Sequence, residues 1–248
     1  MAHRTLSAVA VTTLVLVALT GCGSSSGSSK ASATTTAAPD TPTTTTGPEK
    51  LVGLFKIAPG VCTGTAVSTG SYFQMVFPGG TLAGGRFFQN PDSSCGNKAY
   101  TLFVPGTAGG LESGAYQPNP SPAFDAQGNA LVDSITKPGA FTAIKFSIST
   151  NPIEPQTKKH VPPPSFTVND GKISGQTSSI TGEWNNQAFA QGSPKPDGTS
   201  PGLTTPVHGT YDAATKHFVI EWSSEVVGGP FNSFTGVWHL EGTFVPKA

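Results

Sequence analysis

Apolar and polar residues alternate along much of the second half of the chain, and this two-residue period is the feature that most restricts the fold. In FTAIKFSIS, residues 141–149, single polar residues follow Ile144, Phe146 and Ile148. Successive side chains of a strand point to opposite faces, so the pattern predicts a strand with one buried face and one wet face. Two later segments alternate in the same way, and each places three large residues on one face: Phe218, Ile220 and Trp222, then Trp238, Leu240 and Phe244.

Further strand candidates lie between glycine- and proline-rich turns: SYFQMVF (71–77), AYTLFV (99–104), SFTV (165–168) and SSITGEW (178–184). The clearest hairpin has Asp212 to Lys216 as its turn, and VVGGPFNSF leads from it into the last strand. No stretch beyond the N-terminal apolar run has the spacing of an amphipathic helix. We therefore predict one all-β domain over residues 51–248, an antiparallel β-sandwich or barrel. The alternation fits both a filled interior and a lumen for an apolar ligand.

The N-terminus has the composition of an export signal. Arg4 lies in a short polar head, residues 8–19 form an apolar run, and the run closes with Leu19, Thr20, Gly21 and Cys22. This order is typical of a secretory signal peptide, and an uncleaved N-terminal helix anchor is the alternative.

Residues 19–22 resemble the lipobox of bacterial lipoproteins. The resemblance implies that residues 1–21 are removed as a lipoprotein signal peptide and that Cys22 carries a diacylglyceryl group. Each buried methylene contributes about 0.8 kcal/mol, and two acyl chains hold a protein where one binds only marginally. The resemblance therefore predicts that the chain is attached through its lipid to the extracytoplasmic face of the cell membrane.

Residues 22–50 are predicted to form a disordered tether. After Cys22 this segment contains no aromatic and no large aliphatic residue, and Ser, Thr, Ala and Pro dominate it. It cannot bury enough apolar surface to offset its ordering entropy, and a flexible chain of this length reaches roughly 30 Å. The composition suits an O-glycosylated stalk or a plain linker. A lipobox followed by such a tether resembles lipoproteins of high-GC Gram-positive bacteria.

Cys62 and Cys95 remain as a pair once Cys22 is assigned to the lipid. Oxidising conditions outside the cytoplasm favour a disulfide between them, and two buried free thiols are the alternative. In the chain-entropy estimate, closing this loop of 33 residues stabilises the fold by roughly 3.7 kcal/mol. The cysteines do not have zinc-like spacing, so we predict no metal site, and no motif indicates a cofactor.

The charge balance argues against a nucleic-acid partner. The chain has 14 basic and 14 acidic residues, whereas nucleic-acid binding needs a basic surface.

One motif matches a catalytic pattern but lies in the wrong surroundings. GTSPG, residues 198–202, has the spacing of a G-x-S-x-G nucleophile elbow with Ser200 as nucleophile. The elbow uses the backbone N–H after the serine as an oxyanion donor, and Pro201 has none. We expect a loop here and no catalytic serine.

The C-terminal strands contain histidine and carboxylate residues of the types that form metal or acid–base sites. His208, His217 and His239 lie on neighbouring predicted strands, but His208 and His217 need not share a face, so we expect surface histidines. Glu221 and Glu225 flank Trp222, but nothing in the sequence fixes their separation, so no glycosidase pair is predicted.

Aromatic residues and long loops leave two further candidates for binding. Trp184, Trp222 and Trp238 alternate with apolar residues and are predicted to be core residues, with a sugar-stacking platform as the alternative. The irregular stretches 151–165 and 185–206 exceed ordinary connections, and such loops often carry function. Residues 158–160, Lys-Lys-His, are too small a basic cluster to define a site.

The sequence favours a binding protein over an enzyme. The first hypothesis is an envelope binding or interaction module, whose partner is an envelope protein, a glycan or a lipid. The alternatives are an apolar-ligand carrier and a hydrolase of envelope glycan or lipid. The stretch from Gly209 to Phe244 resembles secreted bacterial β-proteins, which supports the fold and location and assigns no functional residue.

Overall fold

The computed structural model describes residues 47–247, and the predicted all-β, antiparallel class is confirmed within them. Cys22, the predicted signal peptide and the tether up to residue 46 lie outside the described residues. The strands are β1 (Glu49–Leu51), β2 (Gly53–Ile57), β3 (Val61–Thr63), β4 (Ala66–Thr69), β5 (Tyr72–Val76), β6 (Thr101–Leu102), β7 (Gly110–Ser113), β8 (Gly139–Phe141), β9 (Ile144–Thr150), β10 (Ser165–Asn169), β11 (Lys172–Gln176), β12 (Ile180–Trp184), β13 (Gln187–Ala190), β14 (Thr205–Tyr211), β15 (His217–Glu225) and β16 (Thr235–Pro246).

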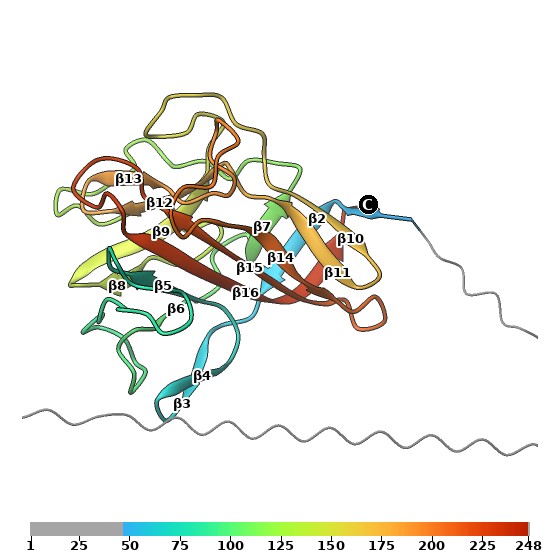
Figure 1. Cartoon of the computed structure of the whole chain (residues 1–248), viewed down its shortest axis with the longest axis horizontal. Coiled ribbons are helices and arrows are strands. Elements are labelled where there is room, and N and C mark those ends of the chain that lie inside the picture. The colour runs from blue at the N-terminus through green and yellow to red at the C-terminus, as the bar shows by residue number, and fades with distance from the viewer. Residues whose placement is uncertain (1–46, 248) are drawn as a thin grey trace, which may run out of the picture. The chain divides into compact units, whose positions relative to one another are not determined.

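Ten strands form one large, nearly closed, barrel-like sheet (Figure 1). Its order is β1-β10-β11-β14-β15-β16-β2-β7, with β5 also paired to β16 and β6 to β5. The predicted C-terminal meander is present as β14, β15 and β16. The long strand β16 pairs along one edge first with β5 and then with β2, which brings the start of the domain against its end.

A smaller sheet of four strands, in the order β13-β12-β9-β8, covers one end of the large sheet (Figure 1). A separate hairpin, β3–β4, carries Cys62, which forms a disulfide with Cys95 across a Cα–Cα distance of 5.4 Å. The disulfide predicted from the cysteine count is therefore present. The first strand begins at Glu49, slightly ahead of the predicted domain start at residue 51.

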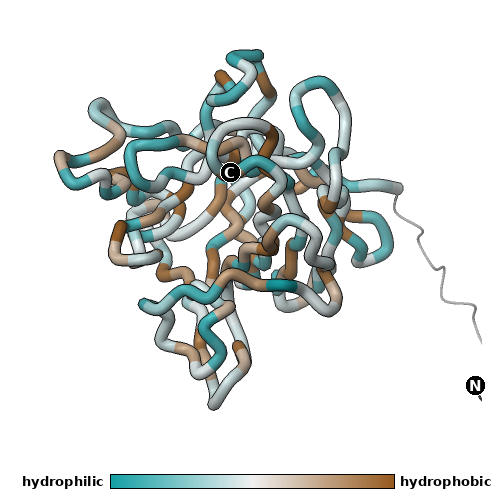
Figure 2. The backbone as a smooth tube through the Cα atoms, turned by 60° about the vertical axis from the view of Figure 1, so that its left-hand side comes forward, coloured by the Kyte–Doolittle hydropathy of each residue, from teal (hydrophilic) through white to brown (hydrophobic). Residues whose placement is uncertain are grey.

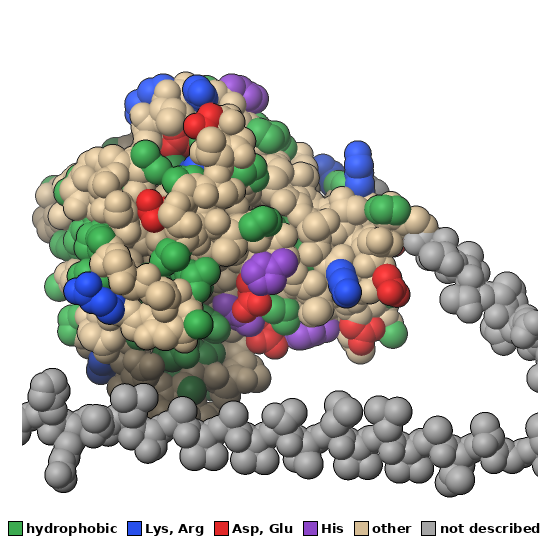
Figure 3. Space-filling view, viewed as in Figure 1, with side chains coloured by type: hydrophobic (Ala, Val, Ile, Leu, Met, Phe, Trp, Pro, Cys, Tyr) green, Lys and Arg blue, Asp and Glu red, His purple; other side chains and the backbone are tan. Residues whose placement is uncertain are grey.

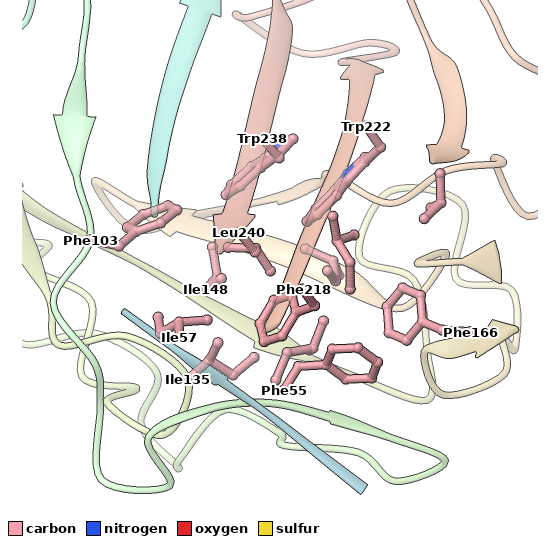
Figure 4. Packing of buried hydrophobic residues seen from close by; sticks show 14 of the residues in the cluster. Phe55, Ile57, Phe103, Ile135, Ile148, Phe166, Phe218, Trp222, Trp238 and Leu240 are labelled. Atoms are coloured by element: carbon pink, nitrogen blue, oxygen red, sulfur yellow. The ribbon is translucent and has the colours of Figure 1, made fainter. Parts of the chain in front are cut away.

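Side chains fill the interior of the large sheet in the part of the chain that the structure describes. Trp222 and Trp238 stack with their ring centroids 5.5 Å apart, and their exposed fractions are 1% and 0%. Phe55, Phe218 and Leu240 pack below them (Figure 4). Many of the hydrophobic segments run through the middle of the molecule (Figure 2). The alternation of β15 and β16 is confirmed as a division between a core face and an outer face.

Gln191, next to β13, satisfies the polar atoms of both buried tryptophans. Its backbone carbonyl accepts the indole N–H of Trp222 at 2.8 Å, and its side-chain Oε1 accepts that of Trp238 at 3.2 Å. Buried indole groups need such partners, because an unpaired buried N–H is costly.

The predicted strand at 141–149 is wrong in two respects. Thr142 and Ala143 have φ values of 53° and 65° and form a tight turn, so the segment is a hairpin of β8 and β9. The polar face of β9 is also wet only near its start, where Lys145 is exposed. Ser147 and Ser149 are fully buried because β12 and the loop around Thr136 cover them.

Candidate functional site

Both long irregular stretches meet at one cleft beside the small sheet. The strands β9 and β13 lie on either side of β12, with Thr150 opposite Ile180 and Ala190 opposite Thr181. The loops that follow β9 and β13 therefore leave the sheet side by side. They enclose a cleft of about 270 Å³ that is lined by Glu154, Gln156, Thr157, Lys159, Ala190, Lys195, Pro196, Asp197, Thr199, Pro201 and Val227.

The first loop is held in shape by the buried carboxylate of Glu154. Its Oε1 accepts the backbone N–H of Gln156 at 2.9 Å, and its Oε2 accepts both the N–H and the hydroxyl of Thr157. Gln156 then ties this loop to its neighbours. Its Oε1 accepts the Ala190 N–H at 3.1 Å, and its Nε2 donates to the carbonyl of Val227.

Lys195, in the second loop, is the buried cation of the cleft. The residue is 7% exposed, and Nζ donates to the Ala190 carbonyl at 3.0 Å and to Ser224 Oγ at 2.7 Å. Burial lowers the pKa of this amine to about 8, although Glu154, Glu225 and Asp197 act in the opposite direction. Among residues 47–247, no carboxylate oxygen lies within 4.0 Å of Nζ.

Two further depressions continue from the cleft along β13. A depression of about 390 Å³ shares Gln156 and Val227 with the cleft and adds Phe189 and Pro230. Phe189 also borders an apolar notch that includes Trp184 and Phe231. The notch measures about 30 Å³, which is room for about two water molecules and far less than an acyl chain requires. We call the cleft, the depression and the notch together the β13 groove.

The three C-terminal histidines form a row with two carboxylates on the outer face of β14–β16, although the sequence did not require His208 and His217 to share a face. Glu221 lies 3.6 Å from His208 Nε2 and 2.8 Å from His239 Nδ1. Glu241 lies 3.7 Å from His239 Nε2 and 3.2 Å from His217 Nε2. Histidine and carboxylate side chains gather on this face in the space-filling view (Figure 3).

Surface placement is correct for two of these histidines, since the side chains of His208 and His217 are 62% and 48% exposed, whereas that of His239 is 17% exposed and stacks on Tyr72. The hydrogen bond from His239, with the charges of His239 and His208, outweighs burial and lowers the pKa of Glu221. Residues 47–247 contain no group of three or more His, Cys, Asp or Glu side chains arranged to hold a metal ion.

A buried carboxyl group that the sequence analysis missed lies in the small sheet. Glu183 of β12 is fully buried, and Oε1 accepts the hydroxyl of Ser149 at 2.5 Å. Burial raises its pKa to about 8, against the opposing hydrogen bonds from Ser149 and Asn119. Glu183 Oε2 and Asn119 Oδ1 have no hydrogen-bond partner among the described residues. Burial therefore favours the protonated, neutral form of Glu183.

The other sequence candidates do not assemble into a catalytic site. Ser200 is exposed in the loop, followed by Pro201. Glu225 accepts the backbone N–H of Leu203, while Glu221 belongs to the histidine row. Trp222 and Trp238 are core residues as predicted, but Trp184 is only partly buried and borders the notch.

Comparisons with known proteins give no relative. No protein-family model matches the chain, no curated protein matches it at a significant level, and no solved structure matches its fold at a significant level. Residues 47–247 contain no helix long and apolar enough to cross a bilayer.

Proposed function

We propose that this chain is a ligand-binding module that its lipid anchors to the extracytoplasmic face of the cell membrane, with the β13 groove as its binding site. The observation that carries the binding role is the convergence of both long loops on a cleft whose wall holds Lys195. A buried ammonium group without a carboxylate partner is costly to fold. Lys195 Nζ donates two hydrogen bonds within the protein, and its third hydrogen is the donor that we assign to a ligand. Ligand sites commonly combine apolar walls with a few such fixed polar groups.

The anchoring part of the proposal is supported by the lipobox at residues 19–22 and the tether that follows it. It is tested by Cys22→Ala in the native host. We expect the variant to leave the membrane fraction, with Ser24→Ala, two residues further along the chain, as the control that stays in it. A Cys22→Ala protein that remains membrane-bound after signal-peptide removal contradicts the lipid anchor.

The binding part is tested by native mass spectrometry of the full chain purified from its envelope. We expect a retained small molecule that is lost on collisional activation and absent from Lys195→Met. A molecule retained equally by Lys195→Met and the wild type places the binding site outside the cleft. A protein that carries no ligand and shows no change on incubation with envelope extract contradicts the binding role.

A further inference from the structure

The chemistry of the β13 groove points to a class of ligand, and this inference rests on the proposed function. Lys195 Nζ uses two of its three hydrogens on Ala190 and Ser224. Ser224 in turn donates to the Gly192 carbonyl at 2.8 Å. This second hydrogen bond holds the Ser224 hydroxyl, and with it the ammonium group, in place. One hydrogen on Nζ has no acceptor among the described residues and is left for a ligand oxygen.

The charges that line the cleft cancel. Lys159 and Lys195 are balanced by Glu154 and Asp197. With two charges of each sign, the lining offers no net attraction to an anion or to a cation. The lining therefore favours a ligand without net charge that can both accept and donate hydrogen bonds.

The carboxylates differ in what they leave free for such a ligand. Both oxygens of Glu154 are occupied by donors of its own loop. Asp197 uses only Oδ1, which accepts the N–H and the hydroxyl of Thr199 at 3.0 and 2.7 Å. Asp197 is exposed, and its Oδ2 remains an acceptor for a ligand hydroxyl. The cleft thus presents a cationic donor and an anionic acceptor together.

Apolar ring surfaces continue the groove away from these polar groups. Pro196 and Pro201 line the cleft, Phe189 and Pro230 line the adjoining depression, and Trp184 borders the notch beyond it. Flat apolar walls beside fixed donors and acceptors match a molecule with C–H faces and hydroxyl edges. Neutral sugars have both features, and two adjoining depressions suit a chain of sugars better than a monosaccharide.

We propose that the β13 groove binds a neutral oligosaccharide. Lys195 Nζ donates to a sugar oxygen, Asp197 Oδ2 accepts a sugar hydroxyl, and Phe189 packs against the next ring along the groove. This assignment commits the module to the neutral glycans of the envelope and excludes phosphorylated or acidic ligands from the cleft.

The proposal is tested by saturation-transfer NMR and calorimetry on the full chain in detergent. The probes are neutral hexasaccharides of glucose, mannose, galactose, arabinose and N-acetylglucosamine, with inorganic phosphate as the anionic probe. We expect at least one hexasaccharide to bind, and Lys195→Met and Asp197→Asn each to weaken it at least tenfold. Lys172→Met, which alters an exposed lysine on β11, is the control and should leave affinity unchanged.

Three results would overturn the oligosaccharide assignment. They are binding of no hexasaccharide at millimolar concentration, affinity that is unchanged by Asp197→Asn, and phosphate binding that depends on Lys195. Because Asp197 is exposed, its substitution does not threaten the fold. If native mass spectrometry still finds a lipid or anion whose binding depends on Lys195, the proposed binding function is supported and only the assignment to oligosaccharides is wrong.

Discussion

The largest side chains buried on the inner face of β15 and β16 are apolar, whereas Ser149 and Glu183 in the small sheet and Lys195 at the cleft are buried polar groups. The apolar side chains do not titrate, so their contribution to stability does not depend on pH. The polar region contains Glu183 and Lys195, whose ionised forms are disfavoured by burial. The difference indicates that the apolar region holds the fold together and the polar region shapes the loops at the cleft.

Trp238→Ala is expected to have the largest effect, because it removes a fully buried ring that stacks on Trp222. Large aromatic-to-alanine changes in a core cost about 3–5 kcal/mol of unfolding free energy. Urea denaturation at pH 7, followed by circular dichroism, measures it. Val245→Ala, an exposed position on the same strand, is the control. A loss below about 1 kcal/mol would show that the apolar region is not the main source of stability.

Glu183→Gln should stabilise the protein, which an apolar-core substitution does not. The folded pKa of about 8 lies above the ordinary value of 4.5, so the unfolded state loses its proton first as pH rises. The stability contributed by the protonated form is complete below about pH 4.5 and declines until about pH 8, by about 1.4 kcal/mol per pH unit.

The glutamine keeps the acceptor for Ser149 and offers an N–H to Asn119, and it does not titrate. We expect the unfolding free energy at pH 7 to rise by roughly 2–3 kcal/mol, and its decline with pH between about 4.5 and 8 to disappear. Denaturation across this range measures both, with Glu49→Gln, which alters an exposed carboxylate on β1, as the control. A variant with an unchanged slope would mean that Glu183 is solvated.

Lys195→Met should give a smaller gain in unfolding free energy, and it should change the pH dependence of stability in the alkaline range. The folded pKa of about 8 lies below the ordinary 10.5, so the folded state releases its proton first. This group makes stability rise with pH between about 8 and 10.5, and methionine abolishes the rise. After allowance for the two lost hydrogen bonds, we expect the unfolding free energy to rise by about 1–2 kcal/mol at pH 7. A destabilised variant would assign Lys195 a purely structural role.

His239→Gln tests the outer face, where charges are paired and partly exposed. The lowered pKa of Glu221 contributes stability above its ordinary value of 4.5, and that stability is lost as pH falls through the folded value. Because the Glu221 side chain is 42% exposed, we expect a loss of no more than about 0.5 kcal/mol at pH 6. NMR titration should show the Glu221 pKa rising, and a larger loss would mean that the row supports the fold.

Period-two alternation was enough to predict the class, the C-terminal meander and the core face of β15 and β16. It failed at Ser147 and Ser149, where β9 is buried on both faces. A polar residue gives the same alternation whether its partner is water or a buried side chain such as Glu183. The β8–β9 turn was missed since Thr142–Ala143 lacks the Asn-Gly or Asp-Gly signature of such turns. Asp170–Gly171 has that signature, and β11 could have been predicted from it.

The cleft was predictable only in part. Loop length singled out residues 151–165 and 185–206, but nothing in the sequence places Glu154 near Lys195, because that depends on which strands flank β12. The histidine row has the same origin. His208, Glu221 and His239 lie opposite one another across three strands, and that register follows from hairpin geometry.

The position of Gln191 links the cleft to the two buried tryptophans, whose fluorescence should respond to ligand binding. The carbonyl that accepts Lys195 belongs to Ala190, the residue just before the glutamine that holds both buried indoles. A ligand bound to Lys195 would change the charge next to the Ala190 carbonyl and, through Gln191, the polarity around Trp222 and Trp238. Occupancy of the cleft is then expressed as a change in tryptophan emission, and no added dye is needed to follow it.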